Sequence, residues 1–197
     1  MRIIAGQHRG RNLVTVRDLS VRPTTDRAKQ TIFDILSNRL DFEGIEVLDL
    51  FAGSGSLGLE AMSRGARQVT FVDKSPQSLQ VLEANVKMLG CADQCTSYAA
   101  DVFWYLKNAR RAFDLVFVDP PYRLERIVDL PAELFASEVL REGTYVVMEH
   151  SKESPVQPSE AMFEITRKTF GQTIVLVLKA RRKEARQSSS HNAEDTP

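Results

Sequence analysis

The sequence predicts an α/β fold with a doubly wound, mostly parallel sheet and helices on both faces, on three observations. From about residue 45 onward, short apolar runs alternate with helical patterns. A glycine-rich loop, 53–58, follows the first apolar run, and the tetrapeptide 119–122 follows the fourth. Strands that alternate with helices form parallel sheets, which bind ligands beyond the carboxyl ends of their strands. The two motifs are therefore expected at one edge of the sheet.

Apolar runs predict the strands. The runs 47–50, 69–72 and 115–118 are almost wholly apolar, as is typical of parallel strands buried on both faces. The last two strands are expected to pair antiparallel around Gly171. The predicted strands are 47–50, 69–72, 95–99, 115–118, 145–149, 162–168 and 173–178.

Helical periodicity predicts five helices. In the segment 25–40 the apolar residues fall roughly on one helical face, and Asp26 in the first turn suits the helix dipole. The predicted helices are 25–40, 56–65, 76–89, 102–111 and 124–140.

The chain divides into three segments. Residues 1–22 are interpreted as a basic N-terminal hairpin extension, because β-like runs at 2–5 and 12–16 flank a glycine-punctuated turn. Residues 23–180 carry the alternating pattern and form the main domain. Residues 181–197 lose all periodicity and are expected to be a disordered tail.

Charge is unevenly distributed along the chain. The formal net charge is 0, but residues 1–30 contain seven lysines and arginines against two aspartates, an excess of +5. A local basic region favours a phosphate-bearing partner such as nucleic acid. A merely solvated basic surface would have the same composition, and charge alone does not separate the two.

Composition argues against several classes of protein. Hydrophobic residues make up 43% of the chain, but no stretch approaches the roughly 20 apolar residues of a membrane span. The N-terminus lacks the apolar region of a signal peptide. We therefore expect a cytoplasmic protein without a membrane partner, and a monomer. Cys91 and Cys95 have no second pair that would complete a zinc site, so no metal is expected.

The glycine loop indicates a nucleotide-like ligand. Its spacing, Gly53-x-Gly55-x-x-Gly58, formally matches the dinucleotide fingerprint. The first two glycines permit a tight turn and close approach of a ligand, and Gly58 permits close packing of helix on strand. The helix that follows offers free N–H groups to an anionic group.

Acidic residues sharpen this interpretation. Asp49, just before the loop, would repel a pyrophosphate but suits an ammonium group, which S-adenosylmethionine carries. Asp73 ends the second strand, where a carboxylate can accept hydrogen bonds from ribose hydroxyls, in NAD as well as in S-adenosylmethionine. Asp101 follows the third strand and could accept a hydrogen bond from the adenine amine. Asp73 and Asp101 could instead be helix N-caps.

The tetrapeptide Asp119-Pro120-Pro121-Tyr122 predicts the chemistry. Two prolines fix the backbone and remove two N–H donors, so the loop presents acceptors, namely the Asp119 carboxylate and the Pro120 carbonyl. Two acceptors can orient an exocyclic amine of a nucleic-acid base, and the Tyr122 ring can stack on that base. An ordinary turn after a strand is the alternative.

Three segments together resemble a known family. The runs 2–11, 22–27 and 48–55 look like the bacterial 16S ribosomal RNA guanine-N2 methyltransferase family, RsmD, and the resemblance covers about residues 2–180. It implies a Rossmann-like class I methyltransferase fold with a seven-stranded sheet, an RNA-binding N-terminal hairpin, S-adenosylmethionine as cofactor, and the 16S RNA of the small ribosomal subunit as partner.

Site residues are expected in three groups. The catalytic group is Asp119, Pro120, Pro121 and Tyr122. The cofactor-binding group is Asp49, Phe51, Gly53, Ser54, Gly55, Gly58, Asp73, Lys74, Asp101 and Val102. The RNA-binding group is Arg9, Arg11, Arg22, Thr24 and Arg27.

Three other functions remain open on the sequence. An N6-adenine methyltransferase of DNA or RNA would use the same tetrapeptide, because adenine also has an exocyclic amine. An NAD-dependent oxidoreductase fits the glycine spacing but leaves Asp49 and the tetrapeptide 119–122 unexplained. A non-catalytic RNA-binding assembly factor fits the basic N-terminus, but it does not explain the intact glycine loop and the tetrapeptide 119–122.

Overall fold

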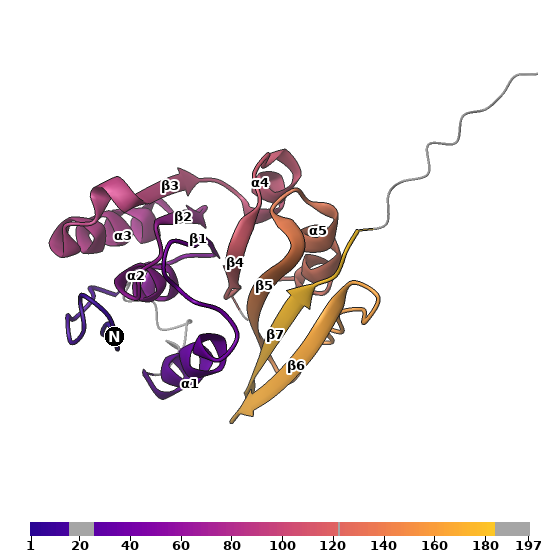
Figure 1. The fold of residues 1–197 in the computed structure, drawn as a ribbon. Coiled ribbons are helices and arrows are strands. Elements are labelled where there is room, and N and C mark those ends of the chain that lie inside the picture. The colour runs from indigo at the N-terminus through magenta and orange to yellow at the C-terminus, as the bar shows by residue number, and fades with distance from the viewer. Residues whose placement is uncertain (16–25, 122, 184–197) are drawn as a thin grey trace, which may run out of the picture.

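A seven-stranded sheet forms the centre of the computed structural model, which describes residues 1–15, 26–121 and 123–183 (Figure 1). The strand order is β3-β2-β1-β4-β5-β7-β6. All pairings among strands β1 to β5 are parallel. Strand β7 pairs antiparallel with both β5 and β6. The strands are β1 (Glu46–Leu50), β2 (Gln68–Asp73), β3 (Cys95–Ala99), β4 (Phe113–Val118), β5 (Leu140–Ser151), β6 (Phe163–Phe170) and β7 (Thr173–Ala180). The predicted seven strands, and the antiparallel pair joined at Gly171, are confirmed.

Helices cover both faces of the sheet, which confirms the doubly wound class (Figure 1). Neighbouring residues of each buried strand belong to opposite apolar clusters: Val47 packs with α1, α2 and α3, and Leu48 packs with α4 and α5. This alternation follows from the period of two in a strand and explains why the central strands are apolar throughout. The helices are α1 (Asp26–Ser37), α2 (Ser56–Ser63), α3 (Pro76–Leu89), α4 (Val102–Asn108) and α5 (Leu130–Ala136).

The helix expected over 124–140 was predicted with the wrong start and the wrong end. A 3₁₀ turn at Ile127–Asp129 precedes α5, which covers only Leu130–Ala136. Pro131 lacks an amide hydrogen and is tolerated only in the first turn of a helix, so the helix begins beside it. Beyond the helix the chain turns into β5, where the Phe113 amide donates to the Val139 carbonyl at 3.0 Å. Pairing with β4 thus replaces the last helical turn.

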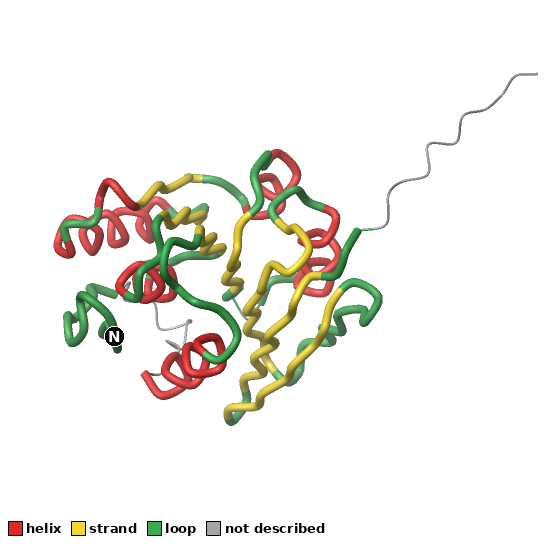
Figure 2. Tube along the Cα trace, in the orientation of Figure 1, coloured by secondary structure: helices red, strands yellow, loops and turns green. Residues whose placement is uncertain are grey.

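The N-terminal hairpin, defined here as residues 1–15, is less regular than two predicted strands (Figure 2). A single antiparallel bridge joins Arg2 and Asn12, and the Ile3 amide donates to the Arg11 carbonyl at 2.9 Å. Ile3 and Leu13 are buried in the core cluster of α1, α2 and α3. Other backbone groups of the hairpin bond to side chains of α2 and α3 instead of to each other. Residue 16, the end of the second expected run, lies outside the described residues.

Within the described ranges, none of the helices is long and apolar enough to cross a membrane. Cys91 and Cys95 are free thiols whose sulfur atoms lie 3.8 Å apart. The described residues contain no group of three or more His, Cys, Asp or Glu side chains that could hold a metal ion.

Candidate active site

Three aspartates lie at the carboxyl ends of three adjacent strands. Asp49 is in β1, Asp73 is the last residue of β2, and Asp119 directly follows β4. In the sheet β1 lies between β2 and β4, and Leu50 is level with Val72 and Val118. The negative charges of Asp119 and Asp73 are close enough to raise the pKa of Asp49. Three of the four predicted aspartates, Asp49, Asp73 and Asp119, therefore lie close together at one edge of the sheet.

Asp49 is a buried carboxyl group whose pKa is shifted by its surroundings. Its side chain is buried, with 2% of the residue exposed, and its Oδ2 accepts a hydrogen bond from the Gly58 amide at 2.9 Å. Burial raises the pKa of Asp49 well above the usual carboxyl value, against the Gly58 hydrogen bond, and the charges of Asp119 and Asp73 raise it further. A buried carboxyl group beside two others favours a ligand that brings a positive charge. The arrangement fits an ammonium group and disfavours a pyrophosphate.

The loop after β1 is held in a left-handed backbone conformation. Phe51, Gly53 and Gly55 have φ values of 58°, 54° and 78°, and Gly55 is the N-cap residue of α2. The Gly53 amide donates to Oδ2 of Asp73 at 2.8 Å. The other oxygen of Asp73 accepts from the Ser75 amide at 2.8 Å. Asp73 therefore anchors the loop, and each of its carboxylate oxygens keeps a second lone pair that can accept a further hydrogen bond.

Phe51 shows what the sequence could not indicate. A positive φ is uncommon for a residue with a side chain, and the neighbouring sequence contains no feature that predicts it at Phe51. The strain is typical of loops that shape a binding site. Ser54 and Gly55 continue the loop into α2, so the predicted loop residues are all part of one turn between β1 and α2.

Gly58 packs the first turn of α2 against β2. A Cβ atom at Gly58 would lie 2.4 Å from Cε1 of Phe71 and 2.8 Å from Cγ1 of Val69. This contact confirms the expected close packing of helix on strand.

We predict that Gly58→Ala lowers the free energy of unfolding by about 1–3 kcal/mol, the usual cost of overpacking a core. Urea unfolding followed by circular dichroism measures the loss. Phe71→Leu removes the ring atom nearest to the new methyl group, so the loss should shrink in that background. An equal loss in both backgrounds would contradict the steric explanation.

Asp101 is the N-cap residue of α4. Its Oδ1 accepts hydrogen bonds from the amides of Phe103 and Trp104 at 3.0 and 3.3 Å. The helix-cap alternative is therefore confirmed for Asp101, which is exposed shortly after β3. Val102, the next residue in the chain, is buried, and Lys74, which follows Asp73, is exposed.

The segment after β4 forms a tight turn. Asp119 is partly exposed, Pro120 is buried and Pro121 is exposed. The Leu124 amide donates to the Pro121 carbonyl at 2.9 Å, which closes the turn. Tyr122, predicted to stack on the base, lies outside the described residues.

Not all basic side chains of the N-terminal region are free at the surface. Arg9, Arg11 and Arg27 are exposed, as expected for phosphate contacts. Arg2 instead pairs with Asp26 at 3.2 Å, and Lys29 is completely buried. The structure describes five of the seven cations counted in residues 1–30, and two of these five are therefore engaged within the protein. Arg22 and Thr24 lie outside the described residues.

Two buried polar residues near the site were absent from the sequence prediction. Glu60 in α2 and Asn85 in α3 are both 0% exposed. Both accept hydrogen bonds from backbone groups of the N-terminal hairpin, 56 and 71 residues away in sequence. A charged or amide residue at an apolar position of a helix was the only available signal.

Comparison with known proteins agrees with this geometry. The family described as "Conserved hypothetical protein 95" matches residues 1–179. The chain is 36% identical to YlbH of Bacillus subtilis, over 92% of the chain and 100% of the relative. It is 34% identical to "Ribosomal RNA small subunit methyltransferase D" of Haemophilus influenzae, over 87% of the chain and 89% of the relative.

A solved structure gives the same result. The structure of yhhF from Escherichia coli, described as a methyltransferase, superposes with a TM-score of 0.83 at 29% identity, over 93% of this chain and 99% of the other. The expected class I methyltransferase fold is thereby confirmed. The chain belongs to this family, the RsmD family of ribosomal RNA small subunit methyltransferases.

Proposed function

We propose that the protein transfers a methyl group from S-adenosylmethionine to the exocyclic N2 amine of a guanine in the 16S RNA of the small ribosomal subunit. The observation that carries this proposal is the set of carboxylates Asp49, Asp73 and Asp119 beside a left-handed glycine loop at one sheet edge. Membership of the family, and the printed name of the Haemophilus influenzae relative, support the RNA of the small subunit as substrate.

Five of the predicted cofactor-binding residues have a defined task in this proposal. S-adenosylmethionine supplies a methyl group that its sulfonium already activates. Asp49 holds the ammonium group, because a buried carboxyl group gains a compensating charge there. Gly53 and Gly55 allow the backbone to approach the ligand closely. Asp73 accepts from the ribose hydroxyls and Asp101 from the adenine amine, each with the lone pairs that its backbone bonds leave.

Asp119 and Pro120 orient the substrate amine. The carboxylate and the carbonyl accept its two N–H groups, which fixes the nitrogen in line with the methyl group and directs electron density to it. Alignment supplies most of the rate enhancement, since effective molarities for well-oriented reactions are large. The proton leaves for water after transfer, when the nitrogen has become acidic. No metal and no second subunit are required, and the reaction is expected in the cytoplasm.

The acceptors Asp119 and Pro120 do not by themselves distinguish guanine from adenine, because the N6 amine of adenine could donate to the same two oxygens. Unmodified small subunits and free 16S RNA should be incubated with methyl-labelled S-adenosylmethionine and digested to nucleosides. Label in N2-methylguanosine is the expected result. Label in N6-methyladenosine would keep the mechanism and overturn the base, and no label in either substrate would contradict the proposed function.

We predict that Arg9→Gln with Arg11→Gln weakens use of the RNA substrate in a salt-dependent way. Both side chains are exposed on the N-terminal hairpin, and each lost phosphate contact removes about 0.7–0.9 from the slope of log K against log salt. Binding to RNA measured from 50 to 200 mM salt should give a slope shallower by about 1.4–1.8. A defect that is independent of salt would indicate misfolding instead.

A further inference from the structure

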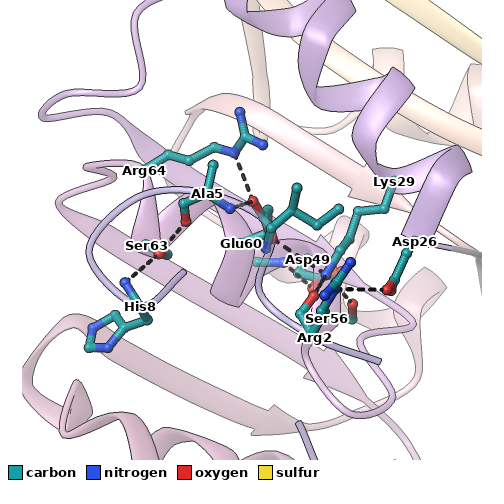
Figure 3. A network of polar contacts seen from close by, with 12 residues as sticks. Arg2, Ala5, His8, Asp26, Lys29, Asp49, Ser56, Glu60, Ser63 and Arg64 are labelled. Atoms are coloured by element: carbon teal, nitrogen blue, oxygen red, sulfur yellow. Dashed lines mark hydrogen bonds and ion pairs between the residues drawn. The ribbon is translucent and has the colours of Figure 1, made fainter. Parts of the chain in front are cut away.

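A buried polar network fastens the N-terminal hairpin to α2 (Figure 3). The Glu60 carboxylate accepts hydrogen bonds from the amides of Ile4 and Ala5 at 2.7 and 3.0 Å. Near the end of α2, the Ser63 hydroxyl donates to the Ala5 carbonyl at 2.6 Å and accepts from the His8 amide at 2.9 Å. These contacts hold the hairpin against the helix that the glycine loop begins.

Lys29 links this network to the glycine loop. Its Nζ atom donates to the Arg2 carbonyl at 2.6 Å and to the Ser56 hydroxyl at 3.2 Å, and it lies 3.4 Å from the Glu60 carboxylate (Figure 3). The Lys29 side chain is completely buried. The Lys29 ammonium group thus joins Arg2, in the first half of the hairpin, to Ser56, the first residue of α2.

Asn85 makes a second link on the other side of the hairpin. Its Nδ2 donates to the carbonyls of Val14 and Ser54 at 2.9 and 3.0 Å, and its Oδ1 accepts from the Val14 amide at 2.8 Å. The residue is 0% exposed. The Asn85 side-chain amide therefore joins Val14, in the second half of the hairpin, to Ser54 of the glycine loop.

The two links reach the loop on either side of Gly55. Lys29 ties Arg2 to Ser56, and Asn85 ties Val14 to Ser54. Gly55 itself is in the left-handed conformation that starts α2. Because Lys29 and Asn85 are both 0% exposed, the hairpin and the loop cannot shift independently without breaking a hydrogen bond made by a buried side chain.

We propose that Lys29 and Asn85 are positioning residues that couple the N-terminal hairpin to the cofactor loop, so that filling either site orders the other. The inference rests on the proposed function, in which the hairpin carries Arg9 and Arg11 to the RNA and the loop holds S-adenosylmethionine. Coupling between two binding sites is reciprocal: RNA on the hairpin raises the affinity for cofactor by the same factor as cofactor raises the affinity for RNA.

Hydrogen exchange of the hairpin tests the coupling without any RNA. S-adenosylhomocysteine, which cannot donate a methyl group, is added to saturation, with binding followed by the fluorescence of Trp104, the only tryptophan of the chain. Amides of Ile3, Gly10 and Leu13 bond within the hairpin and report its opening. The ligand should slow their exchange at least about 5-fold, the lower end of typical coupling.

Two variants should lose this effect, a third should lose part of it, and one should keep it. Lys29→Met removes its hydrogen bonds but leaves Glu60 paired with Arg64, at 2.9 Å, and Ser56→Ala removes only the loop end of the same link. Asn85→Leu removes the second link. Ser63→Ala is the matched control, because it loosens the hairpin on α2 while leaving both links intact.

In Lys29→Met and Asn85→Leu, saturating ligand should slow hairpin exchange less than about 2-fold, with a smaller loss in Ser56→Ala, and Ser63→Ala should retain the wild-type factor. If Asn85→Leu fails to fold, Lys29→Met and Ser56→Ala carry the test. Ligand that binds wild type without protecting the hairpin, or protects it equally in the link variants, would overturn the coupling alone. Wild type that binds no ligand would contradict the proposed function itself.

Discussion

Asp119→Ala is expected to lower the rate of methyl transfer by at least about 10- to 150-fold, the equivalent of one charge-assisted hydrogen bond of about 1.5–3 kcal/mol. Loss of alignment between the amine and the methyl group adds to this. Asp119 follows β4, one strand away from the glycine loop at β1. Affinity for S-adenosylmethionine should therefore stay within a few-fold of wild type.

Single-turnover transfer to unmodified small subunits measures the first effect, and isothermal titration with S-adenosylhomocysteine measures the second. Asp119→Asn is the matched control. Its amide oxygen can still accept one hydrogen bond from the amine but carries no charge. It should keep more activity than the alanine variant. If Asp119→Ala instead loses cofactor binding, the residue faces the cofactor and its assignment to the base is wrong.

The strands could be predicted because their physics is local. A strand buried on both faces is largely apolar on both, and the runs at 47–50, 69–72 and 115–118 have that pattern apart from Asp49 and Thr70. The helix over 124–140 failed because its end depends on a distant partner: β5 extends back to Leu140 in order to pair with Phe113 of β4. Periodicity does not reveal where a strand takes over from a helix.

The site divides in the same way. Its acids and glycines could be found because a strand that ends at a ligand carries them at its carboxyl end, as Asp49 and Asp73 do. The hydrogen bonds that anchor the glycine loop and the N-terminal hairpin could not be predicted from the sequence. Asp73 accepts the Gly53 amide 20 residues away, and Asn85 holds Val14 71 residues away. Such bonds are set by tertiary packing, which also explains why Lys29, counted as a surface cation, is buried.

Asp49→Asn is expected to stabilise the ligand-free protein at neutral pH while weakening its binding of S-adenosylmethionine. Burial raises the pKa of Asp49 well above the usual value, and nearby Asp119 and Asp73 add to this. A raised carboxyl pKa contributes stability that is fully present below the ordinary pKa and is lost as pH rises through the raised pKa. Above that point the empty protein holds a buried, unfavourable charge, which asparagine avoids while still accepting from Gly58 at the same position.

Thermal unfolding from pH 5 to pH 8 checks the sign of this effect. The melting temperature of Asp49→Asn should rise relative to wild type as pH increases, by about 2–4 °C for each kcal/mol. Saturating S-adenosylmethionine should reverse the order, because its ammonium group compensates the carboxylate in wild type only.

Loss of that ion pair predicts about 10- to 150-fold weaker binding in the variant. Binding to wild type should also strengthen with pH up to the raised pKa, since ligand favours the ionised carboxyl group, and the variant should lack this dependence. Equal affinity in both proteins would place the ammonium group elsewhere. A variant that is destabilised at every pH would mean that the Asp49 charge supports the fold, and the three carboxylates would then need a cation other than the cofactor to explain them.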